Sequence, residues 1–247
     1  MARRILKEGA LLAPIPPVLV TVGDENENNI ITVAWTGILA THPPRTYVSV
    51  RPSRHSYGLL KKTGEFVINL APASIARKVD FCGIYTGAKV DKFERCGFTK
   101  IGSEAVKVPT IKECPVALEC KVVEVVPMGT HDVFVADIVS VSCDDKILDD
   151  NGKLCFDRAD LLAYAHGEYF ELGRSLGTFG FSAKKTRTAG GVSRKNTVAD
   201  KSGAQVDEKR ANISKEEKTR PFYLDIAKKS AKMAGGVSNK SGKRSKK

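Results

Sequence analysis

A cluster of cationic and hydroxyl side chains lies at residues 51–56, with the sequence RPSRHS. Arginine guanidiniums hold phosphate through paired N–H donors, and short hydroxyls add further donors. A helix that begins here would contribute free backbone N–H groups at the positive end of its dipole. The residue types predict a phosphate-binding turn, and the alternative is a solvated basic turn without a ligand. The five candidate side chains are Arg51, Ser53, Arg54, His55 and Ser56.

The flanking residues predict a strand, a turn, a helix and a second strand in succession. Residues 47–50 favour a strand, and Pro52 ends it because proline has no N–H for a sheet ladder. Ser56 is a candidate N-cap for a short helix, and Gly64 is a candidate C-cap. Residues 65–69 resume a strand. These elements would bring two guanidiniums, several hydroxyls and a helix N-terminus together within half a dozen residues.

The rest of the chain, as far as residue 173, predicts a mainly β protein with a few helices. Two hairpins are expected, each from a pair of apolar or alternating runs joined by turn residues. The hairpin strands are 18–22 with 30–35, and 116–126 with 131–141; helices are expected at 75–81 and 159–164. Hairpins outnumber helical crossovers, which favours an antiparallel barrel or sandwich. The glycine-rich fingerprints of Rossmann and P-loop nucleotide sites are absent.

The positive charge of the chain is concentrated at its end. The 247 residues carry a formal net charge of +12, but residues 183–247 hold 19 of the 40 Lys and Arg and only 6 of the 28 Asp and Glu. Residues 1–182 are therefore nearly neutral. Low hydrophobicity and high charge predict a disordered basic tail at 183–247. It is either a solubilising extension or an electrostatic tether for nucleic acid, an anionic surface or an acidic partner.

The six cysteines indicate a reducing compartment rather than a metal site or a disulfide framework. No two have the Cys-x-x-Cys spacing and no histidine cluster accompanies them, so no metal is expected. The N-terminal apolar run is interrupted by Lys7 and Glu8, which argues against a signal peptide. No apolar window reaches transmembrane length. We expect a cytoplasmic protein.

Six segments, taken in order, resemble the flavin reductase-like, FMN-binding split-barrel family, close to its flavoredoxin group. They are PIPPVLVTVG, ITVAWTG, the stretch 47–69, VDKFERCGFT, CPVALEC and MGTHDVFVADIVSV, and the likeness spans about Pro14 to Phe181. The resemblance implies an antiparallel split β-barrel over residues 1–182 and a homodimer with FMN in a groove at its interface. It also implies NADH or NADPH as the donor of a hydride to the flavin.

The resemblance also assigns roles to individual residues. The flavin ring edge would meet Ala34, Trp35 and Thr36. The phosphate and ribityl chain would meet Arg51, Ser53, Arg54, Ser56 and Tyr57. The next strand would border the flavin through Asn69, Leu70 and Ala71. Lys92 would be a further ligand that reaches across the dimer, and His131 would lie near nicotinamide and flavin as the catalytic residue. Thr130 departs from the acidic residue that the family has before this histidine.

Alternatives stay open at three of these points. Trp35, the only tryptophan, is either a cleft wall or a core or interface residue, and His131 is either functional or a solvated turn residue. The chain is a flavin reductase, an FMN electron carrier reduced by a partner protein, or a binding protein that acts through its basic tail. The hydride chemistry would belong to the cofactor, which fits the absence of a Ser-His-Asp arrangement.

Overall fold

The computed structural model describes residues 3–183. The predicted disordered tail at 183–247 therefore lies, except for its first residue, outside the described residues. Within the described part, neighbouring strands of the main sheet pair antiparallel, and the sheet has seven strands in the order β2-β1-β5-β8-β9-β4-β3. The prediction of a mainly β, antiparallel fold with a few helices is confirmed.

The main strands are β1 (Val18–Gly23), β2 (Asn28–Val33), β3 (Thr36–Thr41), β4 (Pro44–Val50), β5 (Glu65–Leu70), β8 (Val116–Pro127) and β9 (Asp132–Cys143). Two small hairpins are formed by β6 (Lys100–Ile101) with β7 (Thr110–Ile111) and by β10 (Leu162–Ala165) with β11 (Glu168–Glu171). The α-helices are α1 (His55–Thr63), α2 (Ala76–Ile84) and α3 (Lys92–Cys96). The 3-10 turns are η1 (Ala73–Ile75), η2 (Asp145–Ile147), η3 (Phe156–Arg158) and η4 (Phe181–Ala183).

The sheet curls around one apolar core. Alternate residues of its strands point to the same side, because the side-chain period of a strand is two. Those on the inner side include Val18, Val20, Phe66, Ile68 and Phe134, all nearly or fully buried. Strand β2 also contacts β4, although four strands separate them in the sheet order. The sheet thus closes on itself apart from a split between the β2 and β3 edges.

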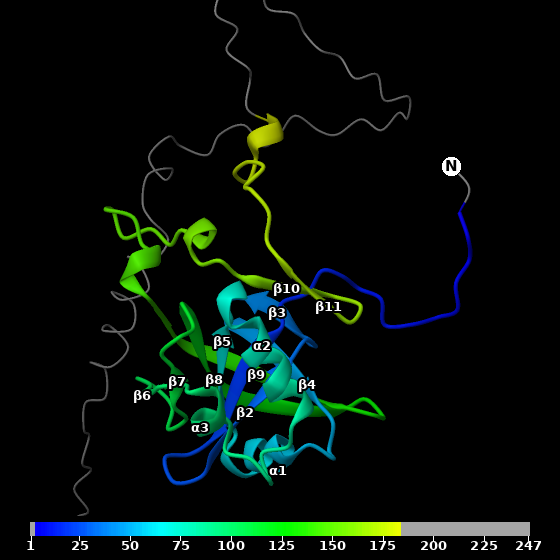
Figure 1. The fold of residues 1–247 in the computed structure, drawn as a ribbon, viewed down its shortest axis with the longest axis vertical. Coiled ribbons are helices and arrows are strands. Elements are labelled where there is room, and N and C mark those ends of the chain that lie inside the picture. The colour runs from blue at the N-terminus through cyan, green and yellow to red at the C-terminus, as the bar shows by residue number, and fades with distance from the viewer. Residues whose placement is uncertain (1–2, 184–247) are drawn as a thin grey trace, which may run out of the picture. The chain divides into compact units, whose positions relative to one another are not determined.

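A second apolar layer covers the outside of β1 and β2. It joins Leu19 and Ile30 from the strands to Val79 and Cys82 of α2 and Phe93 of α3. Strand β1 is therefore buried on both faces, which explains why Thr21 is the one polar residue in its sequence VLVTV. Helix α1 lies at one end of the sheet in Figure 1, below β2 and β4.

Both predicted hairpins are present, but one strand was not predicted and one local prediction is wrong. Residues 36–41, for which the sequence predicts no element, form strand β3 against β4. Residues 159–164, predicted as a helix, instead run into strand β10, which pairs with β11. Both segments are short, and their conformation is set by the strand beside them rather than by their own periodicity.

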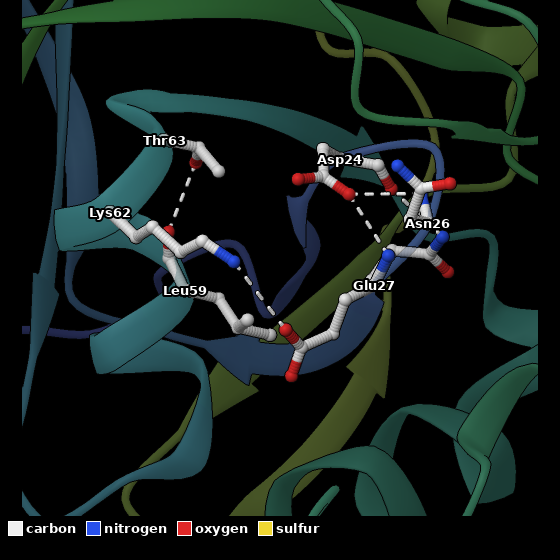
Figure 2. A network of polar contacts seen from close by, with 7 residues as sticks. Asp24, Asn26, Glu27, Leu59, Lys62 and Thr63 are labelled. Carbon is white, nitrogen blue, oxygen red and sulfur yellow. Dashed lines mark hydrogen bonds and ion pairs between the residues drawn. The ribbon is translucent and has the colours of Figure 1, made fainter.

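The β1–β2 turn shows how polar contacts connect the sheet to α1 (Figure 2). The Asp24 carboxylate accepts hydrogen bonds from the backbone N–H groups of Asn26 and Glu27, each 2.9 Å long. Glu27 in turn lies 3.7 Å from the Lys62 ammonium in the last turn of α1. Exposed pairs of this kind contribute little free energy, so packing holds α1 in place.

None of the helices described in residues 3–183 combines the length and apolarity needed to cross a membrane.

Glu119 of β8 is a charged residue outside the cleft that is almost fully buried, with 2% of its surface exposed. Its carboxylate accepts hydrogen bonds from the backbone N–H groups of Glu104, at 2.9 Å, and Ala105, at 2.6 Å, in the β6–β7 loop. We expect Glu119→Ala to lower the free energy of unfolding by about 2–4 kcal/mol, because two N–H groups lose a charged partner. Urea unfolding measures this change.

The matched control is Glu124→Ala, an exposed glutamate on the same strand. Its effect should stay within about 0.5 kcal/mol, as for most surface substitutions. Equal effects of the two substitutions would show that the contact of Glu119 with the loop does not stabilise the fold.

Candidate functional site

A cleft of about 380 Å³ lies at the split of the barrel. The chain leaves β2 at Val33, and Trp35 stands between β2 and β3, where its carbonyl accepts a 3.0 Å hydrogen bond from the N–H of Ser49. Thr36 also donates its hydroxyl to the carbonyl of Tyr47 at 2.6 Å. The cleft is lined by Pro17, Ile31, Thr32, Val33, Ala34, Trp35, Ser49, Val50, Arg51, Arg54, Gly83, His131, Tyr164 and Tyr169.

The cationic or potentially cationic side chains in the lining of this cleft are Arg51, Arg54 and His131. Arg51 and Arg54 come from the basic turn, and His131 comes from the β8–β9 turn. The lining contains no aspartate or glutamate. Within the described residues, neither arginine forms an ion pair with a carboxylate. The cleft is therefore suited to an anionic ligand with an apolar body, which its Ile31, Val33 and Trp35 walls would accept.

A small polar cavity of about 70 Å³ adjoins the cleft and shares Ile31, Arg54 and Gly83 with it. Its other walls carry the hydroxyls and cations that the sequence singled out, together with the loop after α2. The complete lining is Asn29, Ile31, Ser53, Arg54, His55, Ser56, Cys82, Gly83, Tyr85, Thr86, Gly87 and Lys92. The basic turn thus lines both the cleft and the small cavity, and Arg54 belongs to the lining of each.

Lys92 lines the small cavity as a buried cation. It is 3% exposed, and its ammonium donates to the carbonyls of Ile30 at 2.7 Å and Cys82 at 2.8 Å. No carboxylate contacts it among the described residues. Burial lowers the pKa of Lys92, and the nearby charge of Arg54 lowers it further. A buried cation without a counter-charge is costly, and an anion in the cavity would compensate it.

The structure corrects two predictions made for these residues. Lys92 does not reach outward toward a second chain, because its side chain turns inward and is held by carbonyls of its own chain. Ser56 is not the N-cap of α1. The cap position is Arg54, which makes no side-chain cap bond, and the buried Ser56 hydroxyl accepts from the Asn29 amide at 2.8 Å. The first turn of α1 thus lacks a side-chain cap; the N–H of Tyr57 donates to the carbonyl of Arg54 at 2.9 Å, which leaves those of His55 and Ser56 for a ligand.

His131 is fixed by two contacts. The Arg51 Nε–H donates to its Nε2 at 3.3 Å, and its Nδ1 lies 2.9 Å from the Thr130 hydroxyl. Because Nε2 accepts from a cation, the proton of the neutral ring belongs on Nδ1. Burial lowers the pKa of His131, and the charges of Arg51 and Arg54 lower it further. The neutral ring is the form that this site favours.

Tyr57 anchors the same turn from α1 rather than lining either space. Its hydroxyl donates to the Asp132 carboxylate at 2.6 Å, and Asp132 is the neighbour of His131. This hydrogen bond raises the pKa of Tyr57. Tyr57 therefore positions the β8–β9 turn in which His131 lies.

A second, more apolar cleft of about 360 Å³ shares the wall formed by Ala34, Trp35, Ser49 and His131. Its other side is formed by the N-terminal segment and by strands β3, β4 and β9 with the turn before β9. Those residues are Ala10, Leu12, Ile15, Thr36, Tyr47, Met128 and Val133. Trp35 is thus a cleft wall on two sides and is 44% exposed.

The structure does not bring the predicted residues Asn69, Leu70 and Ala71 to the cleft. Asn69 is fully buried; its amide donates to the carbonyl of Leu19 at 3.0 Å and accepts from the N–H of Ile111 at 2.9 Å. Leu70 and Ala71 pack in the apolar layers on either side of β5. These residues hold the sheet together.

Sequence reasoning missed several wall residues, among them Asn29, Gly83, Tyr164 and Tyr169. They lie far apart in the chain, and none belongs to a motif, so only the fold brings them together. Among residues 3–183, no group of three or more His, Cys, Asp or Glu is placed to hold a metal ion.

Residues 12–173 match the flavin reductase-like domain family. The chain belongs to the flavin reductase-like family. This match covers the whole sheet and every residue that lines the two clefts except Ala10, so the family resemblance of the six sequence segments is confirmed. A curated relative from Archaeoglobus fulgidus, itself uncharacterized, is 36% identical over 138 residues, which are 56% of this chain and 77% of the relative.

Solved structures of the family share the split-barrel fold of this chain. Flavoredoxin of Desulfovibrio vulgaris is 30% identical with a TM-score of 0.69, covering 74% of this chain and 100% of that one. Flavoredoxin from Methanosarcina acetivorans is 27% identical with a TM-score of 0.67 and the same coverage. An FMN-binding protein from Thermus thermophilus with bound 1-cyclohex-2-enone is 27% identical with a TM-score of 0.61, covering 72% and 99%.

The titration of His131 tests the electrostatics of the cleft. We expect its pKa to lie below the ordinary value of 6.5 and to rise toward that value in Arg51→Ala. Recovery should be partial, because burial is the larger cause. Since the folded pKa lies below the unfolded one, this group stabilises the fold above about pH 6.5, and that contribution is lost as the pH falls. NMR titration of the histidine rings measures the shift.

The control is Lys146→Ala, which removes one positive charge from an exposed side chain outside the cleft. It should leave the titration of His131 unchanged. An unperturbed His131 in the native chain, or an equal response to both substitutions, would contradict the electrostatic coupling between Arg51 and His131.

Proposed function

We propose that this chain is an FMN-binding oxidoreductase that accepts a hydride from NADH or NADPH and passes the electrons to a second acceptor. The observation that supports it best is the apolar cleft at the split, which is lined by Arg51 and Arg54 and adjoins the small cavity formed by the first turn of α1 and buried Lys92. Family membership and the FMN-binding protein of Thermus thermophilus point to the same cofactor.

The residues present fit FMN at both of its ends. A volume of about 380 Å³ lies within the range of small-ligand sites, and the apolar walls suit a flat ring system. The small cavity presents guanidinium, ammonium and hydroxyl donors without a carboxylate, which is the donor set of a phosphate site. We infer that Arg54, Ser53, Ser56 and Lys92 hold the phosphate and that Ala34 and Trp35 border the ring.

The chain's own part in catalysis is to bind, orient and exclude water. When bound, FMN supplies the two-electron chemistry between a nicotinamide and the next acceptor. The second cleft would orient the nicotinamide, because it meets the first along Ala34, Trp35 and His131. His131, with Nδ1 protonated and Nε2 held by Arg51, would fix the edge of that ring. Holding two rings in a near-attack geometry lowers the barrier by several kcal/mol.

A second candidate function is an FMN electron carrier that a partner protein reduces. The structural likeness to two flavoredoxins favours it. In this case the second cleft would contact a partner protein rather than bind a nicotinamide.

The proposed homodimer is supported by exposed apolar side chains on β3 and in the β8–β9 turn, where Ile38 is 65%, Leu39 53% and Met128 63% exposed. Contacts of the 183–247 tail with nucleic acid or an anionic surface, and a cytoplasmic location, stay predictions.

Anaerobic titration separates these functions. We expect the chain, purified with or reconstituted with FMN, to show a flavin spectrum that bleaches on addition of NADH or NADPH. The second cleft would hold the nicotinamide against the flavin, so the bleaching should saturate with nucleotide concentration. Persistent colour with both nucleotides, together with bleaching by dithionite, would favour the carrier. A chain that takes up no FMN would contradict both functions.

The phosphate site is tested by Arg51→Ala/Arg54→Ala. We expect FMN affinity to fall at least tenfold, about 1.4 kcal/mol, because the phosphate loses the charge-assisted donors of Arg54 and the cleft loses the positive charge of Arg51. Fluorescence quenching of added FMN measures the dissociation constant. The matched control is Lys61→Ala/Lys62→Ala, which removes two charges from the opposite end of the same helix. It should change the affinity less than twofold, and a similar loss in both variants would contradict a specific site.

A further inference from the structure

Two of the six cysteines meet in the layer between the sheet and its outer helices. The Sγ atoms of Cys82 and Cys96 lie 3.9 Å apart, and both side chains are reduced in the structure. Cys82 is in the last turns of α2, and Cys96 is the last residue of α3. Cys114 packs in the same apolar layer, but among the described residues only Cys82 and Cys96 bring their sulfurs within hydrogen-bonding distance of each other.

The pair adjoins the small cavity rather than the middle of the core. Cys82 lines that cavity, and its neighbour Gly83 lines both the cavity and the main cleft. The carbonyl of Cys82 accepts from the Lys92 ammonium at 2.8 Å, and Lys92 is the first residue of the helix that ends at Cys96. The two sulfurs thus meet where α2, which supplies a carbonyl to Lys92, packs against α3, which begins with Lys92.

The two thiols are not equivalent. Cys82 is fully buried, whereas Cys96 is 8% exposed and is the member nearer solvent. Burial raises the pKa of Cys82 to about 12. Burial also raises the pKa of Cys96, but the hydrogen bond with Cys82 and the charges of Lys78, Lys92 and Arg95 oppose that rise. Cys96 is therefore the thiol that reacts first, and Cys82 is the one that follows.

We propose that Cys82 and Cys96 are a redox-active pair that closes into a reversible disulfide when the folded chain meets a low-molecular-weight disulfide. Closure brings the sulfurs about 2 Å nearer than their present separation, to the 2.05 Å of a disulfide bond. The separation of 14 residues gives no Cys-x-x-Cys signal in the sequence. Only the packing of α2 against α3 creates the site.

The reaction balances as two thiol–disulfide exchanges. The Cys96 thiolate attacks one sulfur of the reagent, whose S–S bond breaks and releases one reagent thiol. The Cys82 thiol then loses its proton, attacks Cys96 in the mixed disulfide and releases the second reagent thiol. Two protein thiols are oxidised to one disulfide, and one reagent disulfide is reduced to two thiols.

Closure would also act on the anion site that the proposed function places beside it. A disulfide links the residue whose carbonyl holds Lys92 to the far end of the helix that begins with Lys92. The ammonium would be held more rigidly or displaced, and either change alters the affinity for a phosphate. This consequence rests on the proposed function, whereas formation of the disulfide does not.

The first experiment tests the disulfide itself in the full chain without added flavin. The native protein is incubated with 2-hydroxyethyl disulfide, blocked with iodoacetamide and digested with trypsin. We expect a cross-linked pair of the peptides 79–89, VDFCGIYTGAK, and 96–100, CGFTK, that dithiothreitol separates. The melting temperature of the oxidised form should rise by about 5 °C or more, because the link closes a short loop in the unfolded chain.

The controls use other cysteines of the same chain. Cys143 is exposed and should form a mixed disulfide, which shows that the reagent is active. A Cys143→Ser/Cys155→Ser variant should still form the 79–89 to 96–100 link, and Cys96→Ser should not. Absence of the link in native buffer while Cys143 reacts would overturn the proposal. A link that forms only in denaturant would overturn it as well.

A second measurement tests the coupling to the anion site. In the Cys143→Ser/Cys155→Ser variant, we expect the FMN dissociation constant to differ at least threefold between the oxidised and reduced forms. A difference of less than threefold would overturn the coupling. A chain that binds no FMN in either form would overturn the proposed function, and the peptide link would still decide whether the thiol pair is redox-active.

Discussion

The structure depends on a sheet that closes around one apolar core and stays open at one place. Inward-pointing residues of β1, β4, β5 and β9 fill the barrel, and the β2 and β3 edges part at Trp35. Backbone groups at such an edge must find partners other than a neighbouring strand. The Trp35 carbonyl finds one in Ser49, and the space beside it becomes the cleft. The opening in the ladder is therefore also what gives the site its shape.

Electrostatics then determine what the site can hold. Arg51 and Arg54 are exposed to solvent, so their charges cost little free energy as they stand. Lys92 is different, because its ammonium is buried and its partners among residues 3–183 are two carbonyls. The free chain tolerates this charge at some cost to its stability, and an anion would relieve that cost. The uncompensated charge of Lys92 thus favours a phosphate group in the small cavity. Lys92 also donates to the carbonyl of Cys82, so this cation lies next to the thiol pair.

Local patterns predicted the fold where they were strong. Runs such as 18–22 and 116–126 are apolar or alternating over several residues and are bounded by turns, and each is a strand. Patterns failed where they were short. Residues 36–41 contain Gly37 between polar and apolar residues, and residues 159–164 have an apolar run that suits either a helix or a strand. In both cases the partner strand decided the conformation, because β-structure depends on long-range pairing.

For the site, the sequence by itself determined that a basic, hydroxyl-rich turn stands at a strand–helix junction, because guanidinium and hydroxyl chemistry is visible in residue types alone. It also identified the family, because six motifs in order carry that information. Only the tertiary structure decided that Asn69 supports the sheet while Lys92 faces a cavity, and that Cys82 meets Cys96. Burial and contact depend on which strands and helices pack together, and the spacing of these residues along the chain does not reveal that.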